Sequence, residues 1–333
     1  MILNAWSITI LFMGVLSFLL VIWGGISSFI LYKRWGKSIT QEDRVELENR
    51  SYLVLLIIAV VFLMRLVNWP LFYATFQSFI SDIEGAMCIF GVTQVKPGLT
   101  RFSELLKPLT FFFIGGWLIL NHLDRATKTS PLMRKKLFLL SIICLFVLVD
   151  SLGDILLILG IAPESLVSCC TTVTDISNRP TRTMPISIFG PEYGRPLQSL
   201  FFIIHLALLG FIGVSLKFRI FRRPILGLLF LFSILNACLF LLSQIEVFAP
   251  AMMHLPFHHC LYCLWQYVPD SILLFGFFSL GTFSVGWGFT TELFGRKEEA
   301  ADLLPVYLRR IYSVAFVFLS ISFILLIVHL LVD

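Results

Sequence analysis

The chain has 333 residues, of which 58% are hydrophobic and only 14% are charged, and its mean hydropathy is +0.92. A soluble domain of this length needs more polar side chains to cover its surface, so the composition excludes an ordinary soluble protein. The formal net charge is +5, but it follows the positions of the loops and needs no nucleic-acid partner to explain it. Without internal repeats or a long polar region, residues 1–333 are expected to form a single transmembrane domain.

Apolar runs of about 20 residues, long enough to cross the hydrocarbon core of a bilayer, recur along the whole chain. The first run has no Lys or Arg before Lys33 and is too long for a cleavable signal peptide, so we expect a retained helix. The predicted fold is all-α, a polytopic membrane helical bundle of about eight transmembrane helices in contact with lipid. The spans are expected near 6–32, 52–79, 108–122, 137–162, 197–216, 225–247, 270–292 and 312–332.

The second span contains Arg65 and Pro70, which predict a kink. The segment before it, 41–50, follows Thr40 with Asp43 three residues later, a pattern typical of a capping box with Asp in place of Glu. We therefore expect 41–50 to be a short polar extension of the second helix.

Lys and Arg are distributed unevenly between the loops. Eighteen of the 25 lie in alternate connections, which are 33–50, 123–136, 217–224 and 293–311. Positive loops stay in the cytoplasm, so both termini are expected to be extracytoplasmic, in a multi-pass protein of the bacterial inner membrane. The expected outer loops are 80–107, 163–196 and 248–269.

Five of the seven cysteines fall in those outer loops, namely Cys88, Cys169, Cys170, Cys260 and Cys263. The outer compartment is oxidising, so disulfides, metal ligation or redox chemistry are expected. A bridge between Cys169 and Cys170 would be strained, and a bridge from this pair to another outer loop would tie loops together. The other two cysteines, Cys144 and Cys238, lie within spans and are expected to pack between helices.

The densest group of soft donor atoms lies between Met252 and Cys263. Thiolate, imidazole and thioether groups together favour copper(I), and thiolate with imidazole favours zinc. Leu264 follows Cys263, so the attachment pattern of a c-type haem is absent. The predicted metal ligands are His258, His259, Cys260 and Cys263, with His254, Met252 and Met253 as secondary donors.

The same Cys-x-x-Cys spacing is also typical of dithiol chemistry, in which Cys260 and Cys263 would exchange electrons with Cys169, Cys170 or Cys88. Paired thiols on outer loops resemble those of membrane thiol oxidoreductases that pass electrons to quinone. The resemblance is limited to loop chemistry and assigns no roles to residues. A static bridge between Cys260 and Cys263 is the structural alternative.

Charged residues inside the membrane are costly and need partners. Asp150 and Asp154 are four residues apart and share one helix face, and Arg65 is the expected counter-ion for one of them. These three charged residues are interpreted as an ion pair that fixes the packing of the helices. The alternative is a path for protons or cations, which Glu246 and Asp270 would extend.

Two histidines, His205 and His329, fall toward the outer ends of their spans and could hold a b-type haem; hydrogen-bonded interface histidines are the alternative. A quinone site among the 34 Phe residues is a further possibility.

No phosphate loop, dinucleotide fingerprint or nucleophile elbow is present, which argues against ATP-driven transport. The preferred hypothesis is an integral membrane protein that binds a soft metal, copper first and zinc second, on its outer loops for delivery, assembly or electron transfer. The alternatives are a quinone-linked thiol–disulfide oxidoreductase and a non-catalytic subunit of a larger membrane complex with disulfide-clamped loops. The expected partners are other membrane subunits or a periplasmic metal or redox protein, and whether the chain is an enzyme stays open.

Overall fold

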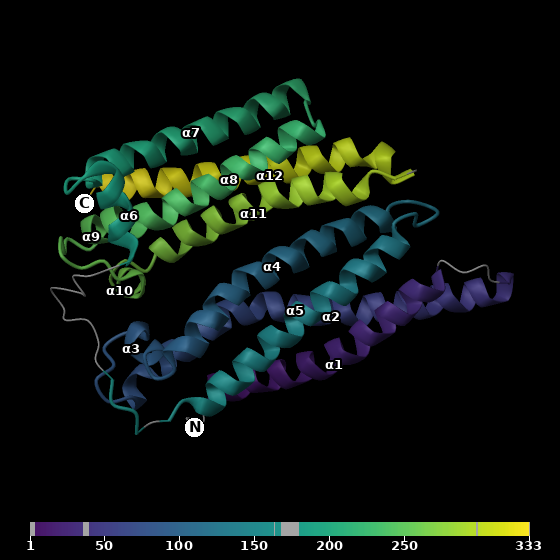
Figure 1. Cartoon of the computed structure of the whole chain (residues 1–333), viewed down its shortest axis with the longest axis horizontal. Helices are drawn as coiled ribbons and strands as arrows, with labels where there is room; N and C mark the ends of the chain where they lie inside the picture. Colours follow the sequence, from purple (N-terminus) through teal and green to yellow (C-terminus); the bar gives the residue numbers. More distant parts are fainter. Residues whose placement is uncertain (1–3, 36–39, 163, 168–179, 298, 333) are drawn as a thin grey trace. The chain divides into compact units, whose positions relative to one another are not determined.

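The computed structural model describes residues 4–35, 40–162, 164–167, 180–297 and 299–332, and every regular element in these ranges is a helix (Figure 1). The all-α prediction is therefore confirmed for this part of the chain. The helices group into two compact units, one formed by 1–168 with 294–303 and the other by 169–293 with 304–333. The single transmembrane domain stays a prediction, and each unit is described by itself.

Eight of the described helices are long and apolar enough to cross a membrane, as the sequence predicts. They indicate a multi-pass integral membrane protein. The eight are α1 (Ala5–Trp35), α2 (Gln41–Ser78), α4 (Pro97–Arg125), α5 (Met133–Gly160), α7 (Gly194–Phe218), α8 (Arg223–Ser243), α11 (Ser271–Gly295) and α12 (Glu299–Val332). The shorter elements are η1 (Ile80–Asp82), α3 (Ile89–Thr93), α6 (Pro180–Phe189), the π-helical turn η2 (Gln244–Phe248), α9 (Ala249–Met252) and α10 (Leu261–Tyr267).

The first unit packs α1 against α5 and α2, and α4 against α5. The buried residues of α1 recur at intervals of three or four, and five of the eight are Gly or Ser, which lets neighbouring backbones approach closely. A Cβ on Gly14 would lie 3.2 Å from Ile155 Cγ1, and a Cβ on Gly24 would overlap Ile58. Glycine at these two positions is therefore what allows α1 to pack tightly.

The N-terminal extension of α2 is confirmed. The helix begins at Gln41, and the Thr40 hydroxyl caps it by accepting from the Asp43 amide at 3.5 Å and donating to the Asp43 carboxylate at 2.5 Å. The helix then runs through Pro70 to Ser78 as one element, and the kink stays a prediction.

Two helices begin earlier than the sequence predicts. Pro97 occupies the first turn of α4, where its missing amide costs nothing, so the helix starts well before residue 108. Lys107, assigned to an outer loop from the sequence, consequently lies inside α4 and is 3% exposed. The connection 293–311 is also largely helical, because α12 begins at Glu299.

The second unit has an aromatic interior. Phe240 of α8 stacks on Phe278 of α11 with ring centroids 3.6 Å apart, and His205 of α7 stacks on Phe323 of α12 at 4.9 Å. Helix α11 is bonded to α12 where Ser322 donates to the Leu274 carbonyl at 3.0 Å. These contacts bring α7, α8, α11 and α12 together.

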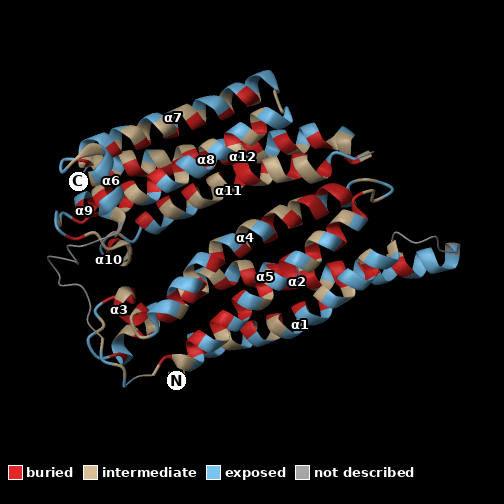
Figure 2. Cartoon of the chain, in the orientation of Figure 1, coloured by how far each residue is buried: buried red, intermediate tan, exposed pale blue. Residues whose placement is uncertain are grey.

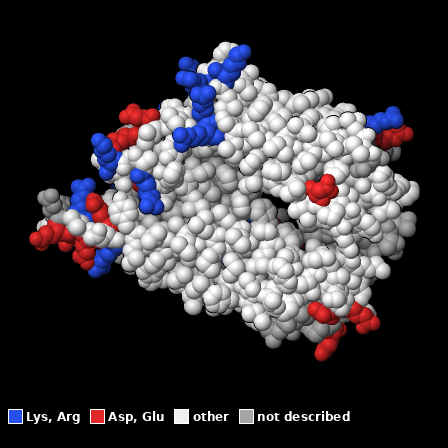
Figure 3. Space-filling view, turned by 180° about the vertical axis from the view of Figure 1, so that it is seen from behind, with Lys and Arg blue, Asp and Glu red and all other residues white. Residues whose placement is uncertain are grey.

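Buried residues follow one side of each long helix, and exposed residues, many of them large and apolar, follow the other (Figure 2). In Figure 3 most of the visible surface along the helices is uncharged, and the charged side chains gather near helix ends. Phe12, Leu105 and Leu231 are each more than 60% exposed, which is unfavourable in water and favourable in lipid.

Candidate functional site

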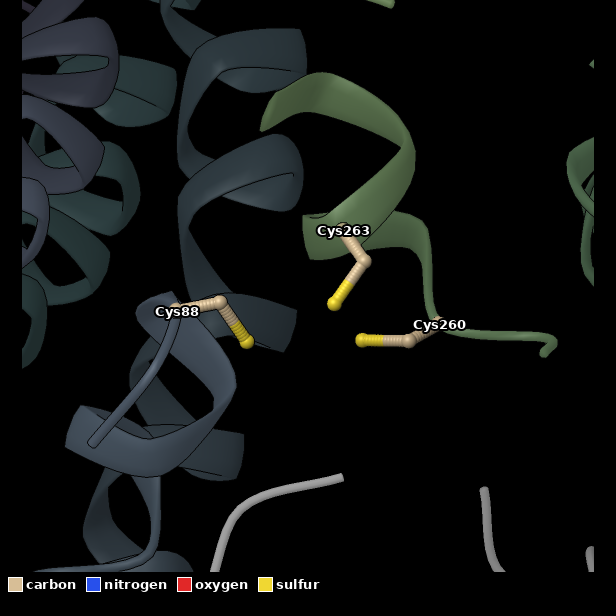
Figure 4. Close-up of side chains that lie close together, drawn as sticks. All are labelled: Cys88, Cys260 and Cys263. Carbon is tan, nitrogen blue, oxygen red and sulfur yellow. The ribbon is translucent and has the colours of Figure 1, made fainter. Parts of the chain in front are cut away.

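The Cys-x-x-Cys motif lies at the start of α10 in the second unit. Cys260 is the N-cap residue and Cys263 is in the first turn, so a three-residue separation brings the two side chains to the same side. Their sulfur atoms lie within 4.8 Å of each other (Figure 4). Two thiolates bound to one tetrahedral zinc, at about 2.3 Å each, are themselves about 3.8 Å apart. The arrangement is therefore compatible with two ligands of one ion.

The segment before this motif is a turn. Helix α9 ends at Met252, and His254 has a φ of 53°, in the left-handed region that non-glycine residues seldom adopt. The amide of Leu255 donates to the Pro250 carbonyl at 3.0 Å, and the amide of His258 donates to the Leu255 carbonyl at 2.9 Å. This turn lies between the predicted secondary donors, which are Met252, Met253 and His254, and the two cysteines.

The predicted ligands differ in burial. Met252 and Met253 are buried, His254 is exposed, and His259 is half-buried. His258 is only 2% exposed, and neither of its ring nitrogens has a hydrogen-bond partner among the described residues. A buried imidazole without a partner is unfavourable. The Cys260 and Cys263 sulfurs are thus brought together, and the metal-ligand role of the predicted histidines stays a prediction.

The remaining cysteines divide as follows. Cys88, also drawn in Figure 4, belongs to the first unit, where it precedes α3 and is 2% exposed. Cys144 is buried in α5 and packs against Gly25 of α1, as expected. The packing prediction for Cys238 is wrong, because it lies on the exposed side of α8. Cys169 and Cys170 lie outside the described residues.

A cluster of four charged side chains lies inside the first unit. Arg65 of α2 forms ion pairs through Nη2 with both Asp150 and Asp154 of α5, the second at 2.8 Å. The expected ion pair is therefore present, and it includes both carboxylates. Lys107 of α4 lies 2.6 Å from Asp154 and 3.3 Å from Asp150, and the Asn68 amide donates to Asp154 at 2.6 Å.

Lys107 and Asn68 were missed by the sequence reasoning, although a signal for Lys107 exists. In the first half of α4, four polar residues recur every three or four positions and are buried, which is the pattern of a polar helix face turned inward. That face consists of Thr100, Ser103, Lys107 and Thr110.

The cluster holds two positive and two negative groups, so its formal charge is balanced. All four side chains are at most 4% exposed. A single charge at this depth would be strongly unfavourable, whereas mutual pairing offsets much of the desolvation cost. The cluster also joins three helices, because its members come from α2, α4 and α5.

Two further acidic residues have neighbours in the second unit. Glu246 lies in the π-helical turn η2 and accepts hydrogen bonds from the hydroxyls of Thr181 and, at 2.7 Å, Tyr193. Asp270 lies 3.0 Å from His329 Nε2. The ion path that these residues would extend stays a prediction.

The two histidines suggested as haem ligands have protein contacts of their own. His205 is fully buried, and its Nδ1 lies 3.2 Å from the Asn236 amide nitrogen. His329 faces Asp270. These contacts match the hydrogen-bonded alternative, and haem ligation stays a prediction.

Comparison with known proteins gives no match: no family model, no curated protein and no solved structure is significantly similar to the chain.

Proposed function

We propose that this chain is a multi-pass membrane protein that binds a soft metal ion, copper(I) or zinc, through the thiolates of Cys260 and Cys263. The observation that supports the proposal is the approach of the two sulfurs to within 4.8 Å in the first turn of α10. Thiolate pairs favour exactly these ions over magnesium or calcium, because sulfur is a soft donor.

A histidine of the adjoining turn completes the proposed ligand set. His258 is two residues before Cys260, and its buried ring nitrogens have no partner in the described part of the chain. A neutral imidazole nitrogen is a good ligand for both copper and zinc, and metal binding would satisfy a polar atom that is otherwise costly to bury.

The positive loops support a location for this site on the extracytoplasmic side of a bacterial inner membrane. There the protein would deliver a metal, take part in assembly, or transfer electrons with a periplasmic metal or redox protein as partner. Copper(I) would favour the electron-transfer role, because zinc has no redox chemistry of its own.

The test is elemental analysis of the purified full chain after loading with copper(I) or zinc and removal of unbound ions. We expect bound metal in the unaltered protein and its loss in Cys260→Ser/Cys263→Ser. Cys238→Ser is the matched control, because it removes a thiol from the exposed side of α8 and should leave the metal content unchanged. Metal retained by the double variant would overturn the proposal.

Histidine variants then identify the third ligand. His258→Ala should lower metal affinity, whereas His254→Ala, at an exposed position on the other side of the turn, should not. The same assay on Cys88→Ser shows whether the thiol of the first predicted outer loop takes part.

A thiol–disulfide oxidoreductase is the second candidate, and the same proximity of the Cys260 and Cys263 sulfurs favours it. In that case the pair should be alkylated after reduction and protected after oxidation, without stoichiometric metal. Alkylation that is equal in both states excludes this candidate.

A further inference from the structure

The charged cluster of the first unit leaves part of its hydrogen-bonding capacity unused. Arg65 is 1% exposed at its side chain, and only its Nη2 is bonded to the carboxylates. Its Nε and Nη1 atoms, together with Asn68 Oδ1, have no partner among the described residues. Two hydrogen-bond donors and one acceptor of the cluster are therefore unused, and they lie within a helix that is long and apolar enough to span a membrane.

Three buried hydroxyl groups on the helices of the cluster also have no hydrogen-bond partner among the described residues. Ser103 and Thr110 flank Lys107 on α4, and Ser151 follows Asp150 on α5; each is at most 3% exposed. None of their hydroxyl oxygens has a partner in the described chain. A Cβ on Gly153 would lie 3.2 Å from Ser103 Oγ, so glycine makes room for this hydroxyl beside Asp154.

Buried polar atoms of this kind are nearly always hydrogen-bonded to protein or to ordered water. Six such atoms lie on α2, α4 and α5, the three helices that carry the four charged groups. Water is the partner that can satisfy donors and acceptors of both kinds, because each molecule donates and accepts hydrogen bonds.

We propose that the four-charge cluster of Arg65, Lys107, Asp150 and Asp154 is the centre of a water-binding site inside the first unit. We place the entry of this water at the helix ends nearest to the cluster, past Leu157 and Ile158, which are each at most 1% exposed. Asp154 is six residues before the end of α5 at Gly160, roughly 9 Å at 1.5 Å per residue. The water exchanges with bulk solvent on that side and gives protons access to the two carboxylates.

The same water does not continue toward the opposite helix ends. One turn beyond Asp150 the interior becomes apolar, and Val147, Phe62 and Ile114 are each fully buried in one hydrophobic cluster. The apolar side chains of this cluster offer no hydrogen-bond partners to water. The cluster is therefore reached from one side, and in this arrangement it is not part of a continuous path through the unit.

Cysteine substitution tests the proposal in the purified full chain in detergent. Ser103→Cys and Ser151→Cys replace a hydroxyl by a thiol of similar size, and Val147→Cys on α5 is the matched control in the apolar layer. Each variant is treated with a small charged thiosulfonate reagent, and mass spectrometry of peptides measures modification at the introduced position apart from the native cysteines. The elution profile of each variant confirms that it is folded.

Ser103→Cys and Ser151→Cys should react at least about tenfold faster than Val147→Cys, because the reactive thiolate forms only where water is present. If both react as slowly as Val147→Cys, the site is dry and the proposal is wrong. If Val147→Cys reacts as fast as the other two, the apolar layer does not exclude water and the one-sided access is wrong. Neither outcome depends on metal binding at Cys260 and Cys263.

Discussion

At the scale of single residues, the first unit contains a buried cluster in which two positive and two negative side chains balance each other. Arg65 and Lys107 each contact both carboxylates, so removing one cation leaves the other shared between two negative groups. Because these side chains are buried, the cost of an unpaired carboxylate is not relieved by bulk water. The cluster is therefore sensitive to the loss of either cation.

Arg65→Met should destabilise the protein by about 3–5 kcal/mol, the usual cost of breaking a buried ion pair from one side. The measurement is the denaturation midpoint of the purified protein in detergent. Arg44→Met on the same helix is the control: Arg44 is 73% exposed in its pair with Glu48, and its loss should cost less than about 0.5 kcal/mol.

A double variant separates charge balance from packing. Arg65→Met combined with Asp150→Asn removes one positive and one negative group and should recover part of the lost stability. Equal stability of the single and double variants would show that the cluster does not act as a balanced set.

At the scale of helices, close packing depends on particular glycines. A Cβ on Gly281 of α11 would lie 2.7 Å from Leu319 Cγ and 3.0 Å from the Leu319 backbone nitrogen of α12. The backbone of Leu319 cannot move aside to make room, as the end of a flexible side chain could. Gly276, on the same helix, has nothing within 4 Å of the equivalent position. The two glycines lie in the same helix and differ only in whether a neighbouring helix is close to them.

Gly281→Ala should therefore destabilise the second unit by about 1–3 kcal/mol through overpacking. Gly276→Ala should be neutral or stabilising by about 0.5–1 kcal/mol, because alanine favours the helical backbone. Thermal denaturation of the two variants side by side gives the comparison. A larger loss at Gly276 than at Gly281 would contradict the packing of α11 against α12.

The starts of α2 and α4 differ in how far neighbouring residues in the sequence determine them. The Thr40 cap of α2 involves residues three apart, so the sequence predicts it and the structure confirms it. The early start of α4 at Pro97 involves a polar helix face whose spacing is visible in the sequence, but the sequence does not show that α5 packs against this face. Lys107 was placed in a loop for this reason.

At the scale of the whole molecule, the distribution of Lys and Arg between loops predicts an orientation in the membrane. Eighteen of these residues lie in alternate connections, and the helices that separate them are long and apolar enough to span a bilayer. Both termini should then lie outside the cytoplasm, on the same side as the Cys260 and Cys263 motif.

Reporter fusions test this orientation. A phosphatase that is active only outside the cytoplasm should be active when fused after Asp333 and inactive when fused within 217–224. A fluorescent protein that matures only in the cytoplasm should give the opposite pattern. Phosphatase activity from the 217–224 fusion would reverse the topology and move the cysteine motif to the cytoplasmic side.

The sequence alone is sufficient to predict the eight helices that are long and apolar enough to cross a membrane, because each is a local property of about 20 consecutive residues. It is also sufficient for the pairing of Arg65 with one of Asp150 and Asp154, because isolated charges are costly in lipid, whereas the structure shows that Arg65 pairs with both. For the site it predicts the proximity of Cys260 and Cys263, whose spacing is one helical turn, but not the burial of His258.

Only the tertiary structure decided what depends on residues far apart in the chain. Lys107 and Asn68 join the charged cluster because α2, α4 and α5 meet at one depth, and the separation of these residues in sequence carries no signal of that meeting. The exposed position of Cys238 likewise depends on which face of α8 its neighbouring helices cover. Helix formation is local and therefore readable from composition, whereas burial of a given side depends on the partner helix that packs against it.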